Sequence, residues 1–163
     1  MWDPFRPERS GSMRIGLVSD THGLVRPAAL DYLRGSDHII HAGDIGKPEV
    51  LDAFGTLAPV TAIRGNIDSG EWAKGLPEVR EETIGGVRIL VLHDLKQLDR
   101  DPAAAGIRVV VSGHSHKPAV DERDGVLYIN PGSAGPRRFS LPVTAGDLLV
   151  SLDLVTPKIV ELE

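Results

Sequence analysis

Seven side chains with metal-binding atoms follow five short apolar runs in this sequence, each close to the end of its run. They are two aspartates, four histidines and one asparagine: Asp20, His22, Asp44, Asn66, His93, His114 and His116. The apolar runs are typical of buried strands, and open α/β sheets bind ligands outside the carboxyl ends of their strands. We therefore expect these side chains to converge at one edge of the fold.

This set of donors has the size and chemistry of a two-metal site. Two ions about 3.5–4 Å apart need roughly this many ligands, with one carboxylate between them. Mixed nitrogen and oxygen donors favour Mn, Fe, Co, Ni or Zn over Ca or Mg. His114 and His116 are two residues apart, as are Asp20 and His22, so each pair can face one ion or two adjacent ions.

Each motif alone also has a simpler interpretation. Gly43-Asp44 and Gly65-Asn66 are common turn sequences, and a single histidine such as His93 at a strand end is often only hydrogen-bonded. The combination of all five motifs in this order favours metal binding. We expect His41 to pack or hydrogen-bond near the site, and Asp68 either to orient a ligand or to cap the segment after it.

The elements that must position these residues change character along the chain. Up to residue 63 strands alternate with helices, which predicts parallel strands with helical crossovers: strands 14–19, 38–41 and 59–63, helices 28–33 and 47–54. Later residues favour hairpins around Gly85-Gly86 and Asp124-Gly125. We also predict a short helix over 99–106, a buried strand over 107–112, and final strands over 142–154 and 157–162, broken at Thr156-Pro157.

This order of elements predicts an α/β protein with a single domain over residues 13–163. Two mixed β-sheets flanked by helices would form a four-layer α/β/β/α sandwich, and a single mixed sheet is the alternative that composition leaves open. Residues 1–12 are polar and rich in Pro and Arg, so we expect an extension that adds little to the core.

Composition excludes several classes of function. The 163 residues have a net charge of -5, which gives no basic signature and argues mildly against non-specific nucleic-acid binding. There is no cysteine, which excludes thiolate zinc sites and cysteine nucleophiles. No apolar run approaches the ~20 residues of a membrane span, and residues 1–12 have no signal-peptide core. We expect a cytoplasmic protein.

The order Asp-x-His, Gly-Asp, Gly-Asn, His and Gly-His-x-His resembles the calcineurin-like metallophosphoesterase superfamily. The run from Met13 to Gly23 and the sequence Asn130-Pro131-Gly132-Ser133 are similar to its YfcE-like phosphodiesterase group. The resemblance implies two β-sheets flanked by helices and a dinuclear centre. It places Asp20, His22, Asp44 and His116 on one metal, and Asp44, Asn66, His93 and His114 on the other, so that Asp44 bridges them.

Two positions depart from the family pattern. Ile67 stands where many members have a histidine beside the substrate, although YfcE-like members commonly lack that histidine too. Asp94 follows the metal-binding histidine where the group usually has glycine, and it adds a charge near the site. Since Ile67 cannot protonate a leaving group, we expect a preference for diesters or activated aryl esters.

The resemblance implies a metal-dependent phosphodiesterase that hydrolyses small phosphate diesters by a metal-bridging hydroxide. Asp44 and Asn66 would support the reaction with no protein nucleophile, and the cofactors would be two divalent transition metal ions, with Mn expected. A small phosphate ester is the expected partner, and a homodimer is possible. The alternatives are a catalytically silent protein-interaction scaffold on the same fold and a mononuclear metallohydrolase acting on another bond.

Overall fold

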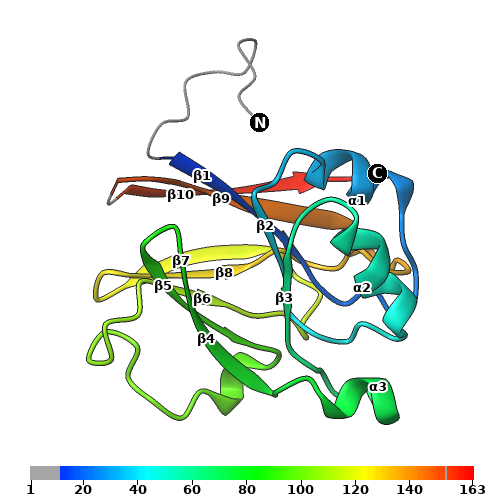
Figure 1. Cartoon of the computed structure of the whole chain (residues 1–163), viewed down its shortest axis with the longest axis horizontal. Helices are drawn as coiled ribbons and strands as arrows, with labels where there is room; N and C mark the ends of the chain where they lie inside the picture. Colours follow the sequence, from blue (N-terminus) through cyan, green and yellow to red (C-terminus); the bar gives the residue numbers. More distant parts are fainter. Residues whose placement is uncertain (1–11, 153) are drawn as a thin grey trace.

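Two five-stranded β-sheets stacked face to face form the body of the protein in a computed structural model that describes residues 12–152 and 154–163 (Figure 1). The first sheet has the order β10-β9-β1-β2-β3, with β1 (Ser12–Val18), β2 (His38–His41), β3 (Val60–Ala62), β9 (Thr144–Ser151) and β10 (Leu154–Glu161). The second has the order β4-β5-β6-β8-β7, with β4 (Val79–Ile84), β5 (Val87–Leu92), β6 (Val109–Val111), β7 (Ala119–Arg123) and β8 (Val126–Asn130).

Both sheets are mixed, as predicted, and the alternative of a single sheet is excluded. In the first sheet β1, β2 and β3 run parallel, and β9 and β10 add antiparallel strands at one edge. In the second sheet β5, β6 and β8 run parallel between antiparallel outer strands. The hairpins β4–β5 and β7–β8 turn at the predicted Gly85-Gly86 and Asp124-Gly125.

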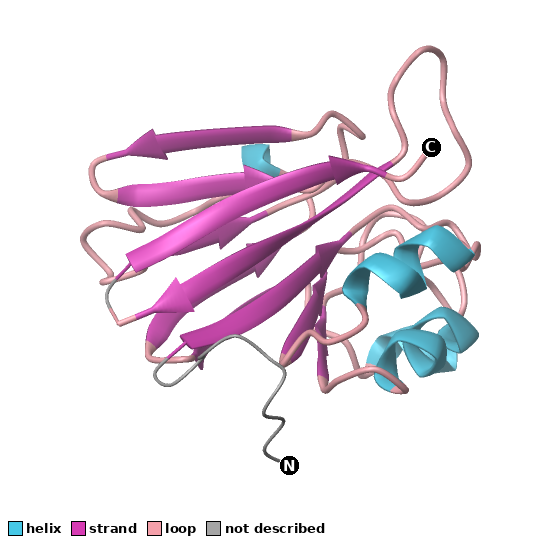
Figure 2. Ribbon diagram, turned by 90° about the horizontal axis from the view of Figure 1, so that it is seen from above, coloured by secondary structure: helices cyan, strands magenta, loops and turns pink. Residues whose placement is uncertain are grey.

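The predicted crossovers connect the parallel strands of the first sheet. Helix α1 (Pro27–Leu33) joins β1 to β2, and α2 (Pro48–Gly55) joins β2 to β3. Each begins with a proline at a position where the missing N–H costs no helical hydrogen bond. A short helix, α3 (Glu71–Lys74), follows β3. Figure 2 shows the longer helices together on one side of the strands, with a short helical segment apart from them.

The main core lies between the two sheets. Alternate residues of each strand face it, because side chains in a strand point to opposite sides. In β5, Ile89 and Val91 face the other sheet, while Leu90 and Leu92 face outward, and all four are buried. The near-continuous apolar sequence of the strand follows from its being covered on both faces.

Helices and loops cover the two outer faces. Leu33 of α1 and Phe54 of α2 pack with Val18 and Ile39 on the outside of the first sheet. The outside of the second sheet is covered by a 3-10 helix, η1 (Leu95–Gln97), and the turns after it. The result is the predicted four-layer order, with a thinner fourth layer than the first.

The helix predicted over 99–106 is wrong. Residues 102–106 form turns, with a hydrogen bond from the Ala105 N–H to the Asp101 carbonyl (3.1 Å) as a single helical turn. The Asp101 side chain accepts from the N–H groups of Ala103 and Ala104, as a helix cap would. Gly106 has φ of +77°, which is not a helical conformation. The chain therefore leaves the helical turn before further hydrogen bonds can offset the unfavourable free energy of helix nucleation.

The predicted break at Thr156-Pro157 is also wrong. Strand β10 runs through Pro157, and the chain reverses at Leu152 instead, which has φ of +54°. Proline is tolerated here because β10 is the edge strand of its sheet and pairs only with β9. Pro157 lacks the N–H that a strand donates, but its nitrogen faces away from β9, so no hydrogen bond between the two strands is lost.

The predicted extension, residues 1–12, lies outside the described residues except for Ser12, which begins β1. Over residues 12–152 and 154–163, no helix is long and apolar enough to cross a membrane.

Candidate metal centre

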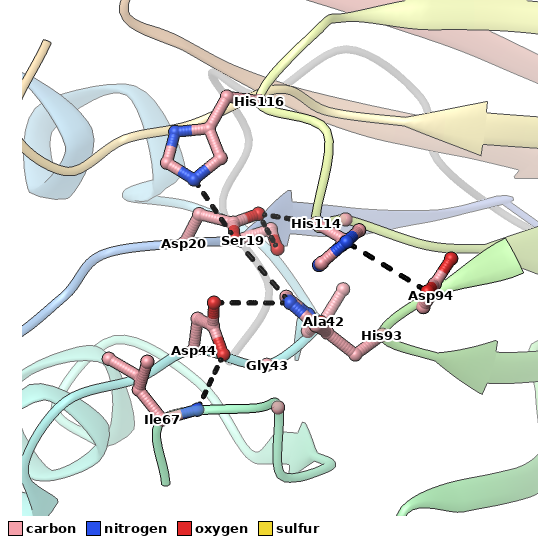
Figure 3. Close-up of polar contacts among 12 residues, drawn as sticks. Ser19, Asp20, Ala42, Gly43, Asp44, Ile67, His93, Asp94, His114 and His116 are labelled. Atoms are coloured by element: carbon pink, nitrogen blue, oxygen red, sulfur yellow. Dashed lines mark hydrogen bonds and ion pairs between the residues drawn. The ribbon is translucent and has the colours of Figure 1, made fainter. Parts of the chain in front are cut away.

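Five of the seven predicted ligands bring donor atoms together where strands of both sheets end, and His114 lies beside them (Figure 3). Asp20 and His22 follow β1, Asp44 follows β2, and His93 follows β5 directly. His114 and His116 lie in the loop after β6. Residues from both sheets therefore meet at one end of the sandwich.

The two carboxylate oxygens of Asp20 have different surroundings: one accepts hydrogen bonds, and the other points to the centre of the site. Its Oδ2 accepts hydrogen bonds from the Ser19 hydroxyl (2.7 Å) and the His114 N–H (3.1 Å). Its Oδ1 is buried without a hydrogen-bond partner, 3.4 Å from His116 Nε2 and 3.7 Å from His93 Nε2. One oxygen fixes the side chain and the other faces two imidazoles.

Asp44 repeats this arrangement from the other strand. Its Oδ1 accepts from the Ile67 N–H at 3.2 Å, and its Oδ2 lies 3.2 Å from His93 Nε2 and 3.6 Å from His22 Nε2. Burial alone would raise the pKa of the Asp44 carboxyl, but His93 and the Ile67 N–H outweigh burial and lower it. The free oxygen of Asp44 thus faces histidines from both halves of the site.

The ring of His93 is oriented by the backbone. Its Nδ1 lies 2.7 Å from the carbonyl oxygen of Ala42, an acceptor only, so Nδ1 carries the proton. In the neutral ring Nε2 then presents a lone pair toward Asp44, and this contact is a hydrogen bond only when the ring is protonated. Burial lowers the pKa of His93, but the Asp44 contact, the Ala42 carbonyl and Asp20 outweigh it and raise the pKa above its ordinary value.

The four histidines form two pairs. The rings of His22 and His116 have centroids 5.4 Å apart, and those of His93 and His114 are 5.2 Å apart. This pairing is the one that the family resemblance implies for the two metals. The free carboxylate oxygens of Asp20 and Asp44 lie among the histidine nitrogens.

Five of the predicted ligands have a backbone conformation that L-residues seldom adopt. Positive φ values between +47° and +72° occur at Asp20, His22, Asp44, His114 and His116. Such residues cost of order 1 kcal/mol or more each and cluster at functional sites. The loops hold this strain because it brings side chains from separate strands to one point.

Two glycines are needed for the backbones to approach so closely. A Cβ on Gly65 would lie 2.3 Å from Asp44 Oδ1, and one on Gly113 would lie 2.0 Å from the Ser19 hydroxyl. The glycine before Asn66 and the glycine before His114 therefore make room for the ligand of another loop.

His41 and Asp68 support the site without entering it. His41 is fully buried, with Nε2 3.0 Å from the Thr21 hydroxyl and Nδ1 accepting from the Gly43 N–H, and burial lowers its pKa to about 3. The neutral ring thus ties the β1 loop to the β2 loop. The expectation that it hydrogen-bonds near the site is confirmed.

Asp68 links the loop after β3 to the loop after β2. Its carboxylate accepts from the N–H groups of Ile45 (3.1 Å), Gly46 (2.9 Å) and Gly65 (2.8 Å). Of the two roles expected for Asp68, the observed one is to orient the loops that carry Asp44 and Asn66.

Ser19 is a supporting residue that the sequence reasoning missed. Its fully buried hydroxyl binds Asp20, and a polar residue ending a buried strand was the signal available. The loop of Asn130 and Ser133 lies against the site through its side chains: Asn130 Nδ2 donates to the Gly113 carbonyl (2.9 Å), and the Ser133 hydroxyl donates to the Asp20 carbonyl (3.1 Å).

Asn66 and His114 lie at the open side of the site. Asn66 is exposed and lines a pocket of about 420 Å³ together with His93 and Asp94. His114 is also exposed, and its Nε2 lies 3.8 Å from Asp94 Oδ2. Asn66 and His114 therefore lie beside the cluster and are more open to solvent than the other five predicted ligands.

The chemistry of this cluster fits bound cations. Asp20 Oδ1, His22 Nε2 and His93 Nε2 are buried and lack hydrogen-bond partners, which is costly unless something else satisfies them. Asp20, His22 and His116 offer donor atoms within 4.8 Å of one another, and so do Asp20, Asp44 and His93. These two groups overlap, because both include Asp20.

The sequence matches the model of the calcineurin-like phosphoesterase superfamily domain over residues 13–151. The chain belongs to this superfamily. A probable metallophosphoesterase of Methanothermobacter thermautotrophicus is 33% identical over 80% of this chain and 82% of its own length. A phosphodiesterase of Methanocaldococcus jannaschii is 29% identical over 74% of this chain and 83% of its own length.

Solved structures share the fold of this chain. The phosphoesterase YfcE of E. coli has a TM-score of 0.65 at 22% identity, covering 93% of this chain and 100% of its own. Vacuolar Protein Sorting 29 of Cryptosporidium parvum has a TM-score of 0.79 at 18% identity, covering 93% and 92%. At these identities the likeness shows the fold, and both an enzyme and a protein named for sorting have it.

Proposed function

We propose that this protein is a phosphodiesterase that uses two divalent transition metal ions, with Mn as the expected metal. The observation that supports this proposal concerns the two oxygens of each carboxylate. In both Asp20 and Asp44, one oxygen accepts hydrogen bonds while the other faces histidine nitrogens. His22 and His116 would hold one ion with Asp20, and His93, His114 and Asn66 the other. Asp44 would lie between the two.

When bound, the ions would lower the pKa of water and offset charge on the phosphate oxygens. The residues of this chain hold that chemistry in place. Ser19 and the His114 N–H fix Asp20, the Ile67 N–H fixes Asp44, and the Ala42 carbonyl fixes His93. Hydrogen bonds of this kind, made to the side chains that would bind the metal, orient those side chains and increase metal affinity.

The open side of the site favours diesters over monoesters. Ile67 is 47% exposed there and has no proton to give to a leaving alkoxide. Asp94 places a carboxylate near His114, where it would repel the second charge of a monoester dianion more than the single charge of a diester. The M. jannaschii relative that is named a phosphodiesterase supports the same substrate class.

An activity panel with Mn tests this proposal. We expect hydrolysis of bis-aryl phosphate, slower hydrolysis of mono-aryl phosphate, and little action on alkyl monoesters. Asp44→Asn, which keeps the shape of the side chain, should abolish the activity, and Glu49→Gln on the exposed face of α2 serves as the matched control. A strong preference for alkyl monoesters would contradict the proposal.

A metal-free interaction scaffold is the competing function, and the fold shared with Vacuolar Protein Sorting 29 favours it. The cluster of unpartnered buried donor atoms argues against it, since a scaffold gains nothing from their cost. Protein that binds no transition metal and hydrolyses no ester with added Mn would support the scaffold.

A further inference from the structure

A second pocket opens on the other side of Asp94 from the Asn66 pocket. It has a volume of about 530 Å³ and lies between η1, the loop after β6 and the β7–β8 hairpin. Asp94 lines both pockets, and His114, the outermost proposed ligand, lines this one. We call it the Tyr128 pocket; it adjoins the candidate metal centre directly (Figure 3 shows the His114–Asp94 contact at the boundary).

An aromatic side chain on the outer face of the second sheet, Tyr128, lines the Tyr128 pocket. Tyr128 stands opposite Asp121 in the β7–β8 ladder, so both point to the outer face of the second sheet. The Arg123 guanidinium lies 4.8 Å from the centre of the Tyr128 ring and 2.7 Å from Asp121. The Tyr128 ring thus lies beside a guanidinium whose charge is paired with Asp121.

Apolar and cationic residues also line the pocket. Leu95 belongs to η1, whose first turn is held by the hydrogen bond from the Lys96 N–H to Asp94 (3.0 Å). The side chains of Lys96 and Lys117 also line the pocket, and no ion pair with a carboxylate of the described residues engages them. The charge of Asp121 is paired with Arg123, so the lining otherwise contains two lysines and the single carboxylate of Asp94.

These features match an organic group on a phosphate more than the phosphate itself. A phosphate alone requires cations and N–H donors, not an apolar leucine and an aromatic ring in the same lining. A flat ring can lie against Tyr128 and Leu95 while its phosphorus remains at His114, because the pocket begins at that residue. The lysines add attraction for the anionic ligand as it enters.

We propose that the Tyr128 pocket receives an aromatic ester group of the substrate, so that this site acts on aryl or heteroaryl phosphate diesters. The Asn66 pocket, on the far side of Asp94, leaves room for the second ester group. This inference rests on the proposed phosphodiesterase function and specifies its substrate class.

Binding of two phosphonates tests the pocket without depending on turnover. In the Mn-loaded full chain, phenylphosphonate should bind about fivefold to tenfold more tightly than methylphosphonate, a factor expected for one aromatic contact. Ala119→Trp, which fills the pocket from β7, should remove this preference, and Leu95→Ala should reduce it. Val120→Trp, on the opposite face of the same strand, should preserve it.

Equal affinity for the two phosphonates in the wild type would overturn the proposal, as would an unchanged preference in folded Ala119→Trp or Leu95→Ala. Hydrolysis of diesters without a phenyl preference would reject the pocket and retain the phosphodiesterase. A phenyl preference without hydrolysis of any ester would reject the phosphodiesterase and retain the pocket as a binding site.

Discussion

His93 Nδ1 lies 2.7 Å from the carbonyl oxygen of Ala42, and this contact sets the direction of the ring's other nitrogen. Since the carbonyl can only accept, the proton of the neutral ring is on Nδ1 and the lone pair of Nε2 points at the carboxylates. Ala42 precedes the Gly43-Asp44 turn, so one short segment of β2's loop both carries a ligand and aims another from the second sheet.

Replacing Asp68 with Asn tests whether the loops after β2 and β3 are positioned by this carboxylate. Asn retains one acceptor oxygen where three N–H groups now donate, so we expect a loss of about 1–3 kcal/mol in the free energy of unfolding and weaker Mn binding. Urea unfolding and Mn titration measure the two effects. Asp52→Asn, exposed on α2, is the matched control; equal values for both variants would show that Asp68 supports neither loop.

The strained backbone at His114 predicts an unusual glycine effect. With φ of +72°, residue 114 has a conformation that glycine adopts freely and alanine does not. Both His114→Gly and His114→Ala remove the imidazole, yet the glycine variant should be more stable by about 1 kcal/mol in metal-free protein. Chemical denaturation of the two variants measures this difference, and a more stable alanine variant would argue against strain at this position.

Neutralising Asp94 should change substrate selection. Asp94→Asn keeps an oxygen to accept from the Lys96 N–H but removes the charge 3.8 Å from His114. Because the repulsion near a partly exposed site is worth roughly 1 kcal/mol, kcat/KM for mono-aryl phosphate should rise about fivefold relative to bis-aryl phosphate. An unchanged ratio, with Mn content equal to that of the wild type, would remove Asp94 from substrate selection.

Tyr32 predicts how stability depends on pH away from the site. Burial and the hydrogen bond to Asp147 (2.6 Å) raise the pKa of Tyr32 to about 12. The native protein keeps this proton between about pH 10 and about pH 12, where the unfolded chain loses it, so stability falls as pH rises through this range. Urea unfolding should show a smaller fall for Tyr32→Phe, and parallel curves for both proteins would contradict the assignment.

The placement of these side chains at strand ends could be predicted because two sequence signals agree. Buried strands are near-continuous apolar runs, and each of these runs stops at a polar residue suited to metal binding. The same reasoning could not find the hydrogen bonds that Asp68 accepts from the N–H groups of Ile45 and Gly46. These residues lie 22 or more positions away in the sequence and belong to another loop. Nor could it show which oxygen of Asp20 is free, which depends on Ser19 and on a backbone N–H from the second sheet.

The two errors in secondary structure have the same origin. Pro157 is a strand breaker only where its N–H position faces a partner, and the position of β10 at the sheet edge is a property of the whole topology. The segment 99–106 carries helix-capping residues at both ends, but Pro102 and Gly106 leave too few residues between them to extend a helix. Local sequence signals were present in both places, and their outcome was decided by context.

Elemental analysis of Mn-loaded protein, after removal of free metal, tests the central claim most directly. The account predicts two Mn ions per chain in the wild type and less than one in Asp44→Asn, because the free oxygen of Asp44 faces histidines of both pairs. Glu49→Gln should retain two. A wild type that binds one ion or none, or an Asp44→Asn variant that still binds two, would contradict a dinuclear centre held through Asp44.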